Sequence, residues 1–113
     1  MNDDFYMRIP VKKHRYYQTP GARLAAYFQM FLKERIADHS FSIEIDHMRD
    51  PDTFTPWVVV NVIGLRTYME WYGTVGREVP MPGSQVQHRF KFDHYDQEKM
   101  AEKIATVMRM LIG

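Results

Sequence analysis

Residues 57–63 read Trp-Val-Val-Val-Asn-Val-Ile, which is the most β-prone stretch of the chain. β-Branched and aromatic side chains favour extended backbone because they pack well on a pleated surface. Upstream, Phe41, Ile43 and Ile45 alternate with polar residues, which is the period-two pattern of a half-buried strand. Downstream, Val86–Phe92 alternates in the same way. These three stretches predict a sheet at the centre of the fold.

Two amphipathic segments flank the predicted strands. Thr19-Pro20 is typical of a helix start, and the apolar side chains that follow recur at three- and four-residue spacing. This pattern predicts a helix over residues 20–38. The same spacing follows Asp96, a residue type that caps helices, and predicts a second helix over residues 97–112.

The connection after the central stretch decides how the sheet is paired. Gly64-Leu65 fits a two-residue type II′ turn, because glycine readily takes the positive φ angle that such a turn needs. Residues 66–72 would then form the returning strand, although their spacing also fits a short helix. Residues 73–84 contain three glycines and two prolines, which predicts a loop.

The predicted order is therefore α-β-β-β-β-α. We expect an α+β fold with an antiparallel four-stranded sheet, arranged as a meander with both helices on one face. A further strand at Phe5–Val11, interrupted by Pro10, is an additional option. The chain divides into an N-terminal arm or edge strand, residues 1–18, and a single α+β domain, residues 19–113.

Composition excludes several classes of protein. The chain has 113 residues, 45% of them hydrophobic and 26% charged, which is typical of a globular domain. The absence of cysteine excludes a disulfide scaffold, a thiolate zinc site and a cysteine nucleophile. No apolar run is long enough to span a bilayer, and a net charge of +1 gives no general affinity for nucleic acid or membranes. We expect a cytoplasmic protein without a cofactor, whose nine methionines belong mainly to the core.

Two Asp-His pairs offer the best case for catalysis. Asp46-His47 and Asp93-His94 both follow predicted strands, and these residue types serve as metal ligands and as acid–base partners. In a meander the first and fourth strands are antiparallel, so the pairs would lie about 20 Å apart at opposite ends of the sheet. No nucleophile elbow or phosphate-binding loop is present. We expect no enzyme and no metal site, and keep a small enzyme using these pairs as a third hypothesis.

The order of helix, three strands and helix resembles the double-stranded-RNA-binding domain. Asp50-Pro51-Asp52 stands where that family has a Gly-Pro-x-His loop, and Tyr72-Gly73 lies near the position of its final hairpin. However, Asp96-Gln97-Glu98 replaces the paired lysines that open the last helix of that family, and residues 74–92 include an additional segment. The resemblance is therefore one of topology and implies no function here.

Nucleic-acid binding is the second hypothesis, on other grounds. Basic and aromatic residues are interleaved in the N-terminal arm. The lysine and arginine side chains would contact phosphates, and the tyrosine rings would stack on nucleobases. The residues concerned are Lys12, Lys13, Arg15, Tyr16 and Tyr17.

The leading hypothesis comes from the predicted hairpin. Its outward face has an aliphatic and aromatic centre with charged flanks, which is typical of an interaction surface. We predict a non-catalytic module that binds a protein partner, or a second copy as a homodimer, and acts as an adaptor, accessory subunit or steric inhibitor. The predicted contact residues are Trp57, Val59, Asn61, Tyr68, Glu70 and Tyr72.

The alternative is that this face is covered within the chain. Either the Val79–Met81 loop or apolar residues of the N-terminal arm would then lie on it. The arm residues concerned are Phe5, Tyr6, Ile9, Tyr16 and Tyr17.

Overall fold

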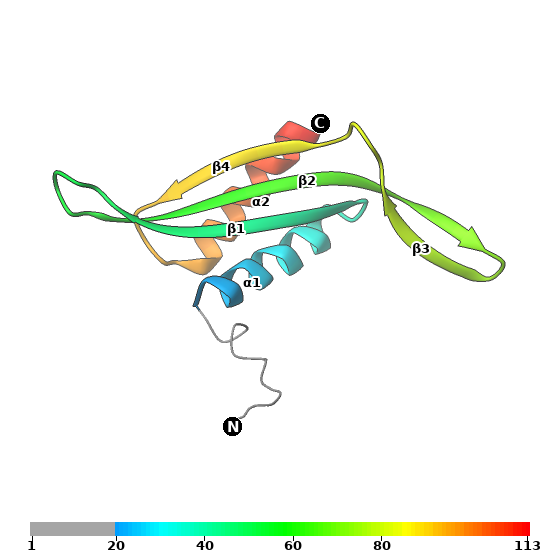
Figure 1. Cartoon of the computed structure of the whole chain (residues 1–113), viewed down its shortest axis with the longest axis horizontal. Coiled ribbons are helices and arrows are strands. Elements are labelled where there is room, and N and C mark those ends of the chain that lie inside the picture. The colour runs from blue at the N-terminus through cyan, green and yellow to red at the C-terminus, as the bar shows by residue number, and fades with distance from the viewer. Residues whose placement is uncertain (1–19) are drawn as a thin grey trace, which may run out of the picture.

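A computed structural model describes residues 20–113 of the chain. Its elements are α1 (Pro20–Arg35), β1 (His39–Arg49), β2 (Pro56–Tyr72), β3 (Val75–Pro80), β4 (Val86–Phe92) and α2 (Gln97–Ile112) (Figure 1). The α+β class and the α-β-β-β-β-α order are confirmed. The predicted strand at Phe5–Val11 and the predicted cap at Thr19 lie outside the described residues.

The sheet is not the predicted meander. β1 and β4 both pair antiparallel with the first part of β2, on either side of it, while β3 pairs with the last part of β2 (Figure 1). Because β1 and β4 each run against β2, they run parallel to one another. Residues 65–72 are strand and not helix.

The predicted turn at Gly64-Leu65 is wrong, because β2 runs through it without a break. A Cβ atom on Gly64 would lie 2.9 Å from a ring carbon of Phe41, so this glycine makes room for the ring. The chain reverses instead at Gly73, which has a φ of 67°, and Tyr72 pairs with Val75 across a two-residue turn. The predicted loop over residues 73–84 therefore contains this turn and β3.

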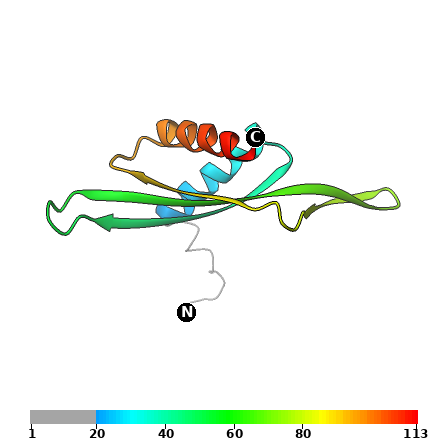
Figure 2. The same ribbon diagram turned by 90° about the horizontal axis from the view of Figure 1, so that it is seen from above.

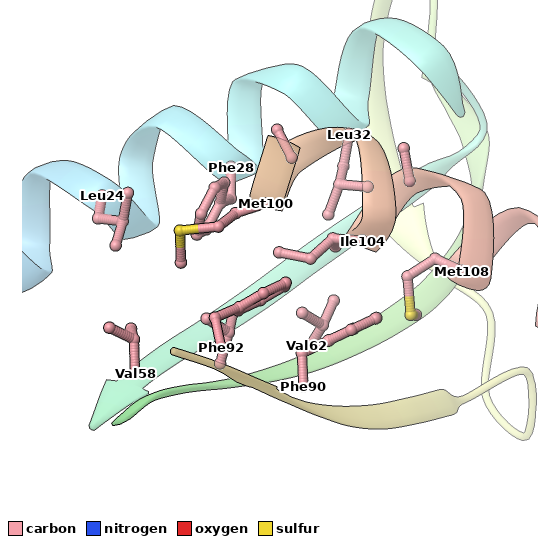
Figure 3. Close-up of a cluster of buried hydrophobic side chains, with 13 residues drawn as sticks. Leu24, Phe28, Leu32, Val58, Val62, Phe90, Phe92, Met100, Ile104 and Met108 are labelled. Carbon is pink, nitrogen blue, oxygen red and sulfur yellow. The ribbon is translucent and has the colours of Figure 1, made fainter. Parts of the chain in front are cut away.

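Both helices pack on one face of the sheet and form a single core with it (Figure 3). α1 lies over β1, and α2 lies on the side of β4 (Figure 1). The core side chains drawn and labelled in Figure 3 are Leu24, Phe28, Leu32, Val58, Val62, Phe90, Phe92, Met100, Ile104 and Met108.

The helix ends agree closely with the sequence patterns. The carboxylate of Asp96 accepts a hydrogen bond of 3.2 Å from the backbone N–H of Lys99, which confirms the predicted N-cap of α2. α1 ends at Arg35, slightly earlier than predicted. The ammonium of Lys33 donates to the carbonyls of Ala37 and His39, and so binds the chain where it leaves the helix for β1.

Beyond the core, the end of β2 and β3 form a two-stranded hairpin that extends past the helices (Figures 1 and 2). We call Thr67–Pro80 the projecting hairpin. The remainder of β2 forms, with β1 and β4, the helix-backed sheet. β2 thus belongs to two structurally different regions.

Candidate functional site: the projecting hairpin

The six predicted contact residues all lie on β2, but they do not form one surface. Trp57, Val59 and Asn61 belong to the helix-backed sheet, and the other three belong to the projecting hairpin. The cross-strand pairs expected from a turn at Gly64 do not exist. Trp57 and Tyr72, which were predicted to share one surface, lie near opposite ends of the same strand.

Within the helix-backed sheet, the predicted surface is largely covered by neighbouring side chains. Val59 is only 3% exposed, contrary to the prediction that it faces a partner. The ammonium of Lys91 lies 4.3 Å from the ring centroid of Trp57, and the guanidinium of Arg89 reaches across β2 to within 3.8 Å of the Met48 sulfur. Both of these long side chains come from β4 and extend across the outward face of β2, which Val59 shares.

The projecting hairpin presents large apolar side chains on both of its faces. Met69 and Trp71 point to one face, while Tyr68 and Tyr72 point to the other, since side chains alternate along a strand. Trp71 is 61% exposed and Tyr72 60%, and Val75 at the turn is exposed as well. No other element among residues 20–113 exposes two adjacent aromatic side chains to this degree.

A hydrogen-bonded group orders one of these faces. The Tyr72 hydroxyl donates to a Glu70 carboxylate oxygen at 2.6 Å, and the guanidinium of Arg77 donates to the same oxygen at 2.9 Å. The bond from Tyr72, with the weaker help of Arg77, lowers the pKa of Glu70, and the same bond raises the pKa of Tyr72. Tyr72 is therefore held in one orientation while its ring stays exposed.

The opposite face is shaped by a glycine. A Cβ atom on Gly76 would lie 2.7 Å from a ring carbon of Trp71 and 2.8 Å from the terminal methyl of Met69. The indole therefore lies against bare backbone on the neighbouring strand, which protects one side of the ring and leaves the other exposed.

The root of the hairpin is tied to α1. A carboxylate oxygen of Glu78 accepts from the Lys33 ammonium at 2.6 Å and from the Thr67 hydroxyl at 2.9 Å. The bond from Lys33, followed by that from Thr67, lowers the pKa of Glu78. These contacts fix the direction in which the hairpin leaves the sheet.

Searches of family models, curated proteins and solved structures found no significant match to this chain. The assignment of a functional surface therefore rests on geometry and chemistry alone.

The two Asp-His pairs lie at the same end of the sheet, contrary to prediction. His47 and Phe92 both pair with Val58, from opposite sides of β2. Among residues 20–113, no group of three or more His, Asp or Glu side chains is arranged so that it could hold a metal ion. The Nδ1 of His94 accepts from the backbone N–H of Asp96, and the His47 ring stacks on Tyr95.

Other predictions fall outside the described residues. These are the nucleic-acid contacts at Lys12, Lys13, Arg15, Tyr16 and Tyr17, and the proposed cover by the N-terminal arm. In the predicted Val79–Met81 loop, Val79 and Pro80 instead end β3 and pair with β2 at the root of the hairpin, and the backbone N–H of Met81, just after β3, donates to the carbonyl of Arg66. In the part of the chain that the structure describes, no helix is long and apolar enough to cross a membrane.

The residues predicted from the sequence to contact a partner did not include Met69 and Trp71, which the structure exposes. The one signal in the sequence that could have pointed to them is the high number of methionines, since methionine is common at binding surfaces. Met100 and Met108 are buried, as predicted, but most methionines in residues 20–113 lie on the surface, where this residue type favours adaptable contacts. The exposed ones are Met30, Met48, Met69, Met81 and Met110.

Proposed function

We propose that this protein is a non-catalytic interaction module that binds a protein partner through the projecting hairpin. The observation that carries this proposal is the pair of exposed aromatic rings at adjacent positions, Trp71 and Tyr72, on a hairpin that extends beyond the core formed by residues 20–113. Trp and Tyr side chains dominate the energetics of protein interfaces when they enter pockets on a partner.

The stability of the hairpin supports the same proposal. A two-stranded hairpin is marginal in water, and exposed aromatic surface on both faces does little to stabilise it. Here the hairpin is held in shape by Gly73 at its turn, by the Glu70–Tyr72–Arg77 group and by the anchor at Lys33. Holding a contact surface in its bound conformation reduces the entropy lost on binding.

The hairpin also has a free strand edge. β2 from Tyr68 onward pairs with β3 alone among the described residues, and β3 pairs only with β2. Unpaired strand edges invite another chain to add a strand, and proteins normally cover or blunt them. A partner can therefore bind the hairpin by its aromatic faces and by its backbone.

The test is to remove the exposed apolar groups of the hairpin and measure partner capture. The variant Met69→Ser/Trp71→Ser/Tyr72→Ser should keep the fold, because none of these side chains is in the core. Affinity capture from the native host, analysed by mass spectrometry, should recover a partner with the parent chain and lose it with this variant. For the purified partner, we expect at least about a tenfold loss of affinity.

A matched control comes from the helices. Met30→Ser/Met110→Ser/Leu111→Ser removes a similar amount of exposed apolar surface from α1 and α2. It should capture the same partner as the parent chain. If the hairpin variant retains every protein that the parent and the control retain, the proposed function is wrong.

A further inference from the structure

The outward face of the helix-backed sheet has its charges sorted by strand. β1 places Glu44 and Asp46 on this face, and β4 places Arg89 and Lys91 on it. The register sets them in rows across β2, so that Asp46, Val59 and Lys91 form one row. The next row is Glu44, Asn61 and Arg89. An acidic strand and a basic strand thus flank an uncharged central strand.

These charges do not neutralise one another within the chain. β1 and β4 are separated by β2, which places the backbones of the acidic and basic residues about 10 Å apart in each row. The Arg89 guanidinium reaches across β2 to the Met48 sulfur on β1. Among residues 20–113, the ion pairs are Lys33–Glu78, Arg35–Glu102 and Arg77–Glu70, none of them on this face. Glu44 and Asp46 also line a shallow depression of about 640 Å³ that reaches across β2 to Arg89. The face therefore keeps an acidic and a basic half.

We propose that this face binds the same face of a second copy of this chain, with the two-fold axis parallel to β2. Rotation about such an axis exchanges the two sides of the sheet. It places β1 of one copy over β4 of the other, so Asp46 faces Lys91 of the other copy and Glu44 faces Arg89. β2 lies over β2, which brings the half-buried side chains of Trp57 and Ile63 into the interface, Trp57 beneath the Lys91 ammonium. A two-fold axis across the strands would instead set acid on acid and base on base, which like-charge repulsion disfavours.

The size of the face sets the strength of this dimer. β1 and β2 face outward over eleven rows and β4 over seven, which at roughly 4.8 Å between strands and 3.3 Å between rows gives about 460 Å² per copy. The total of about 900 Å² is below the usual size of a stable interface, so the dimer is weak and reversible. The axis parallel to β2 also makes both projecting hairpins extend from the same end of the dimer. A partner with two binding sites would then engage both hairpins at once.

The test is sedimentation of the full chain from about 1 to about 500 µM, a range that spans weak dimer affinities. We expect a monomer–dimer equilibrium that higher salt weakens, because the facing charges are screened. Asp46→Lys and Lys91→Asp should each raise the dimer dissociation constant about tenfold, since each sets like charges against each other twice. The double variant Asp46→Lys/Lys91→Asp should restore the parent value, because it exchanges the two charges and keeps every facing pair opposite.

The control is Glu34→Lys, which makes the same charge change as Asp46→Lys at an exposed position on α1. It should leave the dissociation constant unchanged, and thermal unfolding checks that every variant is folded. A chain that stays monomeric throughout the range overturns the proposal, and in that case the N-terminal residues are the candidate cover for this face. A dimer that ignores Asp46→Lys, or that the double variant fails to restore, overturns it too. None of these outcomes depends on partner capture by the hairpin, so the two proposals fail separately.

Discussion

The two halves of β2 show how differently one strand can be used. In the helix-backed sheet, Val58, Val60 and Val62 are fully buried beneath the two helices. In the projecting hairpin, the same strand carries Trp71 and Tyr72 largely exposed to solvent. Both halves have high β-propensity, so propensity alone does not distinguish them. What distinguishes them is whether a helix covers the strand.

This division separates stability from recognition. Hydrophobic burial is the main favourable term in folding, and it is concentrated where α1 and α2 meet the sheet. The hairpin has mainly cross-strand pairs and surface hydrogen bonds, each worth little. A substitution of a buried side chain in the first region should therefore lower the free energy of unfolding far more than a substitution of an exposed side chain in the hairpin.

The largest effect is expected from exchanging one buried aromatic for alanine. Phe28 on α1 is 0% exposed and packs at the centre of the core, so Phe28→Ala should lower the free energy of unfolding by about 3–5 kcal/mol. Trp71→Ala removes a larger side chain, but because this side chain is exposed, the free energy of unfolding should change by no more than about 0.5 kcal/mol. Urea denaturation followed by circular dichroism measures both. Similar losses for the two variants would show that the hairpin belongs to the core.

The second comparison uses one substitution in both regions. Gly64→Ala and Gly76→Ala each push a methyl group into an aromatic ring, that of Phe41 or that of Trp71. Phe41 packs against the core and cannot withdraw freely, so Gly64→Ala should cost about 1–3 kcal/mol. Trp71 is exposed and can move, so Gly76→Ala should cost much less and alter the indole environment instead. Urea denaturation measures the cost, and tryptophan fluorescence in a Trp57→Phe background reports the indole.

These two glycines also show why the sequence predicted the fold class but not the pairing. The strand and helix periodicities of residues 41–45 and 97–112 are local, and both held in the structure. The turn was assigned to Gly64 because a glycine between two β-prone runs is typical of a hairpin. Nothing local distinguishes it from Gly73. The difference is that Gly64 contacts Phe41 from another strand, and such a contact is visible only once the strands are paired.

The same error explains what was missed at the candidate site. With the turn misplaced, Trp57 and Tyr72 were expected on one surface, and β4 was expected beside the third strand. The structure places β4 beside β2, which lets Arg89 and Lys91 reach across the outward face of β2 and sets the acidic and basic strands on either side of it. The alternation of polar and apolar side chains along β1 and β4 was predicted correctly. Which strands lie next to each other was not predictable, because the loop sequences between the strands do not specify the strand order.

The smallest effect is expected at the junction of the two regions, where His39 pairs with Arg66, the last residue of β2 before the hairpin. His39 is 4% exposed, and its Nδ1 has no hydrogen-bond partner among residues 20–113. Burial, followed by the positive charges of Arg66 and Lys33 and partly offset by Asp38, lowers its pKa below the ordinary value of 6.5. The folded state therefore takes up a proton less readily than the unfolded state.

Stability from this group is fully present above pH 6.5, the unfolded value, and is lost as pH falls through the lower folded-state pKa. Urea denaturation at a series of pH values between about 7 and 5 should show this loss in the parent chain, within the usual titration range of histidine. His39→Gln keeps a polar side chain but cannot titrate, so its unfolding free energy should change less over the same window. Glu70 and Glu78, whose pKa values are lowered, affect stability only at more acidic pH, and they are present in both the parent chain and the His39→Gln variant. Parallel curves for the two chains would show that protonation of His39 does not affect folding, and that the junction with the hairpin is insensitive to its charge.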